Sequence, residues 1–366
     1  MFRTPGGGHD GSDARPYRRR VSPGSWEVPV MLDAPRLWEP HVRLALPVRH
    51  VPGESTGSFV NRLARANGLQ LGELLDRVGL GQTAVDPRYA EMYVNQAGLE
   101  YLAVLAGRPA VALQRALPSL APERIPPGDG PARWHWPWEP TDGYLVRGCD
   151  LCAAARGARE SVWLMCPDNW HICVRHSRWT DDGRGDTAGV VRLDKLPEVI
   201  DAHRRRLLRR RRVGAAAEGL FADAFQIVGH WWSSAPGTPV WHERATEVGL
   251  DPLEARAAPL VFYPEAVFVA GALVDYERRL AAGGDGAVVL AVLDVALERW
   301  GLDVARARSP LREWVMRHRE PAPRFGGSRR RPLLALGPGH QRSAEMAGSL
   351  VDRSCLPWQL GLGHAE

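Results

Sequence analysis

Residues 149–176 carry two paired motifs that constrain the fold more than any other part of the chain. Two residues separate Cys149 from Cys152, and Cys173 and His176 repeat that spacing after an interval of 20 residues. A thiolate or imidazole pair at this spacing on a tight turn faces a single ion, and two such turns complete the tetrahedron that zinc prefers. Pairs at this separation are typical of zinc ribbons, here with His in the last position. We therefore predict one zinc ion bound by these four residues.

The predicted zinc site is structural, because four protein ligands leave no position for the water that a catalytic zinc usually holds. Two further candidates lie in the same window. Cys166 ends a predicted short strand at residues 161–166, where we expect a small buried side chain. His171 is a spare ligand or a solvated strand residue. Neither replaces Cys173 or His176 in the predicted set.

The size and composition of the chain predict a soluble protein with two or three domains. With 366 residues, 45% of them hydrophobic, the chain is long enough to bury at least two cores. We find no secretory signal and no uninterrupted apolar stretch of membrane-spanning length, so we expect no membrane association. The cysteines cluster at metal-binding spacing, which suits a reducing compartment better than a disulfide scaffold does. We expect a cytoplasmic protein.

The net charge of +5 favours a nucleic-acid partner, and the arginine clusters carry that argument. Lys195 is the only lysine among 47 basic residues, a bias typical of GC-rich codon usage. A helix predicted over residues 196–212 has seven arginines in its last nine positions. DNA phosphate or an acidic protein surface would supply the counter-charge, and a solvated helix face is the simpler alternative. The predicted DNA contacts in this run are Arg205, Arg206, Arg209, Arg210, Arg211 and Arg212.

A second candidate DNA-binding element lies in the N-terminal half. Helices predicted at residues 98–106 and 109–117 are joined at Gly107, in the outline of a helix-turn-helix. In that geometry the second helix enters the major groove, so Arg108, Gln114 and Arg115 are candidates for base contacts. A helical hairpin with no role in DNA binding fits the pattern equally well.

The fold class expected from these elements is mainly α. We predict a disordered tail at 1–43, a helix-turn-helix-like helical domain at 44–133 and a small zinc-ribbon-like module with short strands at 134–182. A C-terminal helical domain at 183–320 and a basic irregular tail at 321–366 complete the chain. The aromatic block Trp134-His135-Trp136-Pro137-Trp138 is expected to cover the small core of the zinc module, with base stacking as the alternative.

The motifs of common enzyme classes are missing from the sequence. The chain has no phosphate-binding Gly-Lys-Ser/Thr loop and no Gly-x-Ser-x-Gly nucleophile elbow. Cys173 and His176 could imitate a thiol nucleophile and its base, but the zinc spacing accounts for both. We expect no enzymatic activity and no small-molecule substrate.

Three stretches of the sequence resemble the TniQ/TnsD family of transposition accessory proteins. The first is Leu46-Pro-Val-Arg-x-x-Pro-Gly-Glu-Ser55 followed by residues 58–68. The second is the Cys149–His176 motif with Trp163 inside it, and the third is the helix beginning at Leu196, which is similar to that of actinobacterial members. The motif departs from the family pattern at Asp150, where Pro is usual, at Val174, where Pro is usual, and at Ser177, where Gly is usual.

This resemblance implies a non-catalytic adaptor that links target DNA, or a DNA-bound complex, to an AAA+ ATPase of the transposition machinery. It implies duplex DNA and that ATPase as partners, and an association with the nucleoid. The alternative is a stand-alone zinc-containing DNA-binding transcriptional regulator.

Overall fold

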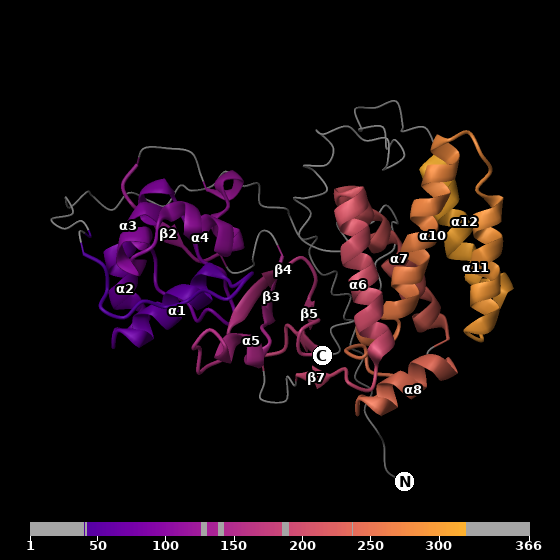
Figure 1. Cartoon of the computed structure of the whole chain (residues 1–366), viewed down its shortest axis with the longest axis horizontal. Coiled ribbons are helices and arrows are strands. Elements are labelled where there is room, and N and C mark those ends of the chain that lie inside the picture. Colours follow the sequence, from indigo (N-terminus) through magenta and orange to yellow (C-terminus); the bar gives the residue numbers. More distant parts are fainter. Residues whose placement is uncertain are drawn as a thin grey trace, which may run out of the picture. The chain divides into compact units, whose positions relative to one another are not determined.

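The computed structural model describes residues 40, 42–125, 130–137, 143–184, 190–235 and 237–319. Within these ranges the chain is mainly helical, with twelve α-helices and a few short antiparallel strands, as predicted (Figure 1). The predicted disordered tails at 1–43 and 321–366 lie outside the described residues, apart from residues 40, 42 and 43. No helix in the described ranges combines the length and the apolar character needed to cross a membrane.

The first helical group contains α1 (Thr56–Ala66), α2 (Leu71–Val78), α3 (Gln96–Ala106) and α4 (Ala110–Ala116). Ser55 begins α1, because its side chain accepts a hydrogen bond from the Ser58 N–H. Phe59 and Leu63, one turn apart, are buried in the core shared by these helices. Gly107 ends α3 in the left-handed conformation, with φ 61°. The predicted helix–glycine–helix outline is therefore present, with helix ends within two residues of the prediction.

The segment after α4 belongs to this first core. Two single-turn 3-10 helices, Pro118–Leu120 and Pro122–Arg124, follow α4. Strands β1 (Tyr93–Val94) and β2 (Trp134–His135) then pair antiparallel. Trp134 and Trp136 are buried in the first helical core, so the expectation that they cover the zinc module was wrong. The Trp134 ring N–H donates to the carbonyls of Leu75 and Gly79 at the end of α2, which holds it there.

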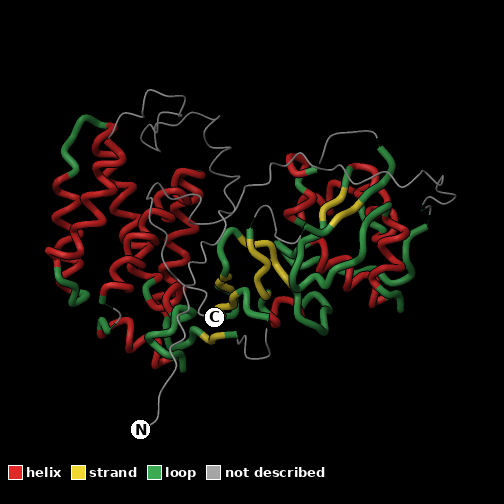
Figure 2. Tube along the Cα trace, turned by 180° about the vertical axis from the view of Figure 1, so that it is seen from behind, coloured by secondary structure: helices red, strands yellow, loops and turns green. Residues whose placement is uncertain are grey.

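The middle of the chain holds the remaining strands, which are short (Figure 2). Strands β3 (Tyr144–Arg147) and β4 (Trp163–Cys166) form one antiparallel pair, with α5 (Asp150–Ala154) between them in sequence. Strands β5 (Trp170–Cys173), β6 (Arg178–Asp181) and β7 (Val191–Arg192) form a three-stranded antiparallel sheet. The predicted strand at 161–166 corresponds to β4.

The C-terminal helical group has one large core. It contains α6 (Pro197–Val213), α7 (Ala215–Ser234), α8 (Pro239–Glu247), α9 (Ala258–Val261), α10 (Tyr263–Ala281), α11 (Ala287–Arg299) and α12 (Val304–Arg319). Helices α6, α7 and α10 lie side by side (Figure 1). The same hydrophobic core includes Trp170, Ile172 and Trp179 of the β5–β6 pair, so this sheet packs on the C-terminal helices.

Candidate metal centre

The first half of the metal centre follows β3. Cys149 stands at the N-cap position of α5, and Cys152 lies in the first turn of that helix. This turn places both thiols on the same side of the chain, as the two-residue spacing predicts. Arg178 of β6 forms an ion pair with Asp150 of α5, which fixes the turn against the other half of the site. Burial alone would raise the pKa of the Asp150 carboxyl, but the bond with Arg178 outweighs it and lowers that pKa.

The second half of the metal centre lies between β5 and β6. Cys173 ends β5, and His176 is in the tight turn that leads into β6. Ser177 closes this turn with φ 46°, the one positive φ of a non-glycine residue within the described ranges. A side chain in this conformation costs about 1 kcal/mol or more relative to Gly.

The four predicted ligands meet at one point. The Nδ1 atom of His176 lies 3.4 Å from Sγ of Cys149, 3.3 Å from Sγ of Cys152 and 3.6 Å from Sγ of Cys173. The sulfurs of Cys152 and Cys173 are 3.6 Å apart, and all four ligand atoms lie within 4.8 Å of one another. Tetrahedral zinc with ordinary bond lengths requires edges of about 3.8 Å between sulfurs and about 3.6 Å between sulfur and nitrogen. The cluster therefore has the size of a zinc coordination shell.

The chemistry of the cluster also suits a cation. Burial, together with the neighbouring thiols of Cys173 and Cys149, raises the pKa of the Cys152 thiol to about 12. Burial raises the pKa of Cys149 as well. The thiols of Cys149 and Cys152 therefore resist losing their protons unless a positive ion compensates the charge, and a bound divalent metal provides that compensation. The Cys3His cluster thus fits a metal ion by both distance and charge.

The two spare candidates lie outside the cluster. Cys166 is buried at the end of β4, opposite Tyr144 of β3, as expected of a small buried residue. His171 lies on β5 and is partly buried, and burial lowers its pKa to about 4. Neither residue belongs to the cluster of four.

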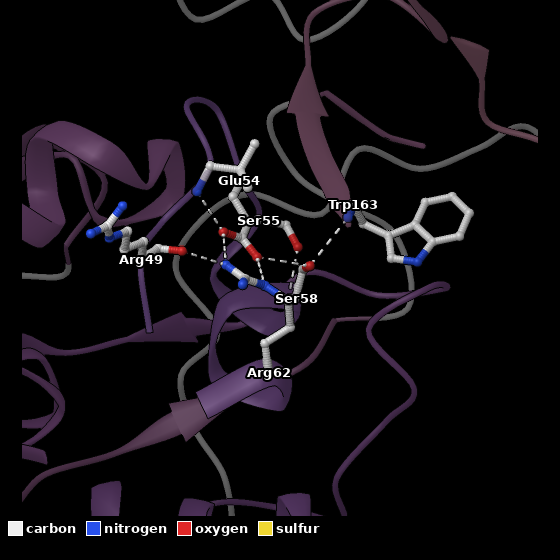
Figure 3. A network of polar contacts seen from close by, with 7 residues as sticks. Arg49, Glu54, Ser55, Ser58, Arg62 and Trp163 are labelled. Carbon is white, nitrogen blue, oxygen red and sulfur yellow. Dashed lines mark hydrogen bonds and ion pairs between the residues drawn. The ribbon is translucent and has the colours of Figure 1, made fainter. Parts of the chain in front are cut away.

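A buried ion pair lies within the first helical group, at the point where that group meets β4 (Figure 3). The Glu54 carboxylate accepts hydrogen bonds from Nε of Arg62 at 2.8 Å and from its NH2 group at 2.7 Å. Both side chains are almost fully buried, at 0% and 6% exposure. The backbone N–H of Val51 and the Ser58 hydroxyl also donate to Glu54. Every charge in this pair is hydrogen-bonded, as a buried ion pair requires.

The same network reaches strand β4. The Ser58 hydroxyl accepts a hydrogen bond from the Trp163 N–H at 3.1 Å, and the Ser55 N–H donates to the Trp163 carbonyl at 2.8 Å. Figure 3 shows the bond between Ser58, at the start of α1, and Trp163 of the strand. The Met165 N–H continues the pairing by donating to the Gly53 carbonyl. The Pro-Gly-Glu-Ser segment therefore lies along β4, and its polar residues have a structural role.

A second buried ion network connects the zinc module to the C-terminal helices. Arg206 of α6 binds Asp168, in the turn between β4 and β5, at 3.0 Å, and Glu218 of α7 at 2.5 Å. Its guanidinium also lies 3.7 Å from the centre of the Phe221 ring. Burial works against the charge, but the two carboxylates outweigh it and raise the pKa of Arg206 further. The two halves of the metal centre are thus anchored to different helical groups. The β3–α5 turn is held through β4 to the first group, and the β5–β6 turn is held to the C-terminal group.

The arginines of α6 divide into an inner and an outer set. Arg206 is buried with its charge neutralised inside the protein, so its proposed contact with DNA is withdrawn. Arg209 is half-buried and donates to the Val267 carbonyl at 3.1 Å. The outer set is exposed and consists of Arg204, Arg205, Arg210, Arg211 and Arg212; Arg204 also pairs with Asp201 one turn earlier.

Of the helix-turn-helix candidates, Arg108 lies in the α3–α4 turn, and Gln114 and Arg115 lie near the end of α4. Arg108 and Arg115 are exposed, and Gln114 is half-buried. Val111 is exposed beside them on α4. All three polar residues are thus on or near the surface, and α4 has only 7 residues.

Sequence reasoning missed both buried ion networks. For Arg206 a signal was present, because Val199, Ala202 and Arg206 are spaced by three and four residues and share the buried face of α6. Its partner Asp168 lies 38 residues earlier in the sequence. Helical periodicity relates residues only a few positions apart, so it does not indicate this contact. Arg62 lies within the apolar pattern of α1, two turns after Glu54.

Comparison with known proteins identifies the family of the region that contains the metal centre. The TniQ family model matches residues 45–178, from the segment before α1 through the metal ligands. No curated protein and no solved structure matched the chain. The matched region contains the Glu54–Arg62 pair and all four residues of the cluster. Residues 45–178 of the chain therefore form a TniQ domain.

Proposed function

We propose that this protein is a non-catalytic DNA-binding adaptor in transposition, which links DNA or a DNA-bound complex to an AAA+ ATPase. The observation that carries the proposal is the TniQ match over residues 45–178, since this family is associated with transposition and is generally non-catalytic. The four cluster residues are all engaged with one another, which supports a structural centre.

The metal in this proposal is one zinc ion held by Cys149, Cys152, Cys173 and His176. Zinc favours the tetrahedral set of thiolates and imidazole that these residues offer. Its role is to join the β3–α5 turn to the β5–β6 turn. Because these turns are anchored to different helical groups, the metal holds the TniQ domain in its folded form.

The DNA-binding surface in this proposal is the outer arginine set of α6, with α4 as a candidate for base contacts. Arg205, Arg210, Arg211 and Arg212 are exposed on one helix, where phosphate would relieve their mutual repulsion. Arg108 is exposed in the α3–α4 turn, Arg115 is exposed in the last turn of α4, and Gln114 is partly accessible. The first surface would supply sequence-independent affinity, and the second would supply sequence preference.

Replacing Arg211 and Arg212 with Gln is expected to weaken duplex binding and to flatten its salt dependence. Each phosphate contact contributes about −0.9 to the slope of log K against log salt concentration, so the slope should change by about 1.8. Fluorescence anisotropy with a labelled duplex at several salt concentrations measures this slope. The control is Arg306→Gln with Arg312→Gln, two exposed arginines on α12. Equal slopes for both variants would assign the α6 arginines to a protein partner.

The adaptor proposal predicts that the purified protein neither hydrolyses ATP nor cuts or joins DNA with Mg²⁺ or Mn²⁺ present. Its effect should appear with a partner, so an AAA+ ATPase should co-purify from native lysate and stay bound after nuclease treatment. Nuclease separates a protein contact from association through DNA. Metal-dependent nicking that is lost on mutation of a carboxylate would identify an enzyme. Binding to a specific operator, with no ATPase captured, would favour the transcriptional regulator.

A further inference from the structure

The segment before α1 connects the α3–α4 turn to the zinc module. At its first end, the Leu44 N–H donates to the carbonyl of Leu105, in the last turn of α3, at 2.9 Å. At its other end, Val51 is buried in a small core with Ala153 of α5 and with Ala158. The side chains on this segment therefore lie between two turns that are far apart in the sequence.

Basic side chains from three parts of the chain gather along this segment. Arg43 and Arg49 are exposed on the segment itself, and the Arg49 side chain points away from the buried ion pair (Figure 3). Arg43 packs against the α3–α4 turn, because a Cβ atom at Gly107 would lie 3.2 Å from its Cδ atom. Arg108 in that turn and Arg156 in the turn after α5 are also exposed. None of these four arginines forms an ion pair with another residue in the described ranges. With one histidine they make up the basic cluster, which consists of Arg43, Arg49, His50, Arg108 and Arg156.

His50 is the group of the basic cluster that titrates near neutral pH. Burial, followed by the charges of Arg156 and Arg108, lowers the pKa of its imidazole below the usual value of 6.5. Glu54 raises this pKa, but Arg62, the ion-pair partner of Glu54, lowers it again. Charges from the α3–α4 turn and from the zinc module thus act on the same imidazole, so the cluster is compact.

We propose that the basic cluster binds the phosphate backbone of duplex DNA, and that His50 takes up a proton from solvent on binding. The inference rests on the proposed DNA binding and adds to it a second phosphate-binding surface, apart from α6, whose affinity depends on pH. Phosphate supplies the negative charge that the arginines lack, and a nearby negative charge favours protonated imidazole. Because Arg108 immediately precedes α4, phosphate bound there would position that helix against the duplex.

The direction of the pH effect follows from the state of His50 in the free protein. Its pKa is below 6.5 without DNA, and bound phosphate would raise it. Between the two values the complex holds a proton that the free protein lacks, so affinity rises as the pH falls through this interval. Above both values His50 is neutral in both states, and the effect disappears. An opposite charge shifts a pKa by about one unit or more, so binding should tighten about fivefold from pH 8 to pH 5.5.

The first test is duplex binding by the full chain, measured by fluorescence anisotropy at fixed salt between pH 8 and pH 5.5. His50→Gln should lose the gain in affinity at low pH, because it removes the group that takes up the proton. The control His242→Gln, at an exposed position on α8, should keep that gain. Calorimetry at pH 6.5 in two buffers of different ionisation enthalpy should show proton uptake on binding by the unmodified protein, and this uptake should be missing from His50→Gln.

A second variant, Arg156→Gln, tests the contribution of the zinc module. Loss of one phosphate contact should reduce the slope of log K against log salt concentration by about 0.9. Arg159→Gln removes the same charge from an exposed position three residues later and should leave the slope unchanged. Circular dichroism identical to that of the unmodified protein shows that each variant is folded.

Two results would overturn this inference and leave duplex binding on α6 in place. One is a gain in affinity at low pH that His50→Gln retains, and the other is a slope for Arg156→Gln no different from that for Arg159→Gln. Either result would assign the basic cluster to an acidic protein surface. Absence of duplex binding by the unmodified protein at every pH would overturn the proposed DNA binding itself, and this inference with it.

Discussion

Replacing Cys152 with Ser is expected to empty the metal centre and to unfold the zinc module. The Cys152 Sγ atom lies 3.6 Å or less from both Cys173 Sγ and His176 Nδ1, so the substitution removes one of the four ligand atoms. Zinc binding supplies about 10–16 kcal/mol of folding free energy in small zinc-dependent folds. Loss of the metal should therefore lower the stability of this module by many kcal/mol. Metal content by plasma emission spectrometry should fall from about one zinc per chain to near zero.

The matched control for this variant is Cys166→Ala. Cys166 is also a buried thiol of the same module but lies outside the ligand cluster, so the protein should keep its metal. Full zinc occupancy in Cys152→Ser would disprove the ligand assignment. Limited proteolysis should also cut the Cys152→Ser protein between residues 143 and 184, because the two turns lose their common ligand.

Replacing Arg62 with Met is expected to destabilise the TniQ domain by about 3–5 kcal/mol, because it leaves Glu54 buried without a counter-charge. The double variant Glu54→Gln with Arg62→Met should recover part of this loss. Gln carries no charge and keeps an oxygen for the Val51 N–H, which donates to Glu54 at 2.9 Å. Hydrogen exchange of the α1 amides measures the change as a loss of protection.

Arg65→Met, three residues further along α1, is the control for the Arg62 variant. Arg65 pairs with Glu160 at the surface, with 65% of its side chain exposed. An exposed pair contributes about 0–1 kcal/mol, so protection of α1 should hardly change. Similar losses of α1 amide protection in the Arg62 and Arg65 variants would show that the buried Glu54–Arg62 pair stabilises the domain no more than a surface pair does.

The sequence predicted the parts of this protein that local rules control. The ligand set followed from the spacing of Cys149 to His176, because each half of the site is a single turn of chain. The α3–α4 turn followed from Gly107, which adopts the left-handed conformation that such a turn requires. Helix ends were found within about two residues, since caps and breaking residues are local signals.

The features that sequence reasoning missed depend on contacts between distant segments. Arg206 was one of seven similar arginines, and only the carboxylates of Asp168 and Glu218 distinguish it. Trp134 and Trp136 pack on helices that lie far before them in the sequence, although they adjoin the zinc module along the chain. The core in which a residue is buried depends on the tertiary fold. Proximity in sequence to the zinc module therefore predicted the wrong core for these two tryptophans.

The hydrogen bonds between α1 and β4 have a consequence for the order of events during protein synthesis. Ser58 precedes its partner Trp163 by 105 residues. At about 5–20 residues per second, the ribosome needs roughly 5–20 seconds to make the intervening chain. During that interval the start of α1 lacks the strand that completes its bonding, so the TniQ domain folds fully only after β4 has been made. A pause or truncation before residue 163 would release a nascent chain with this edge open to chaperones and proteases.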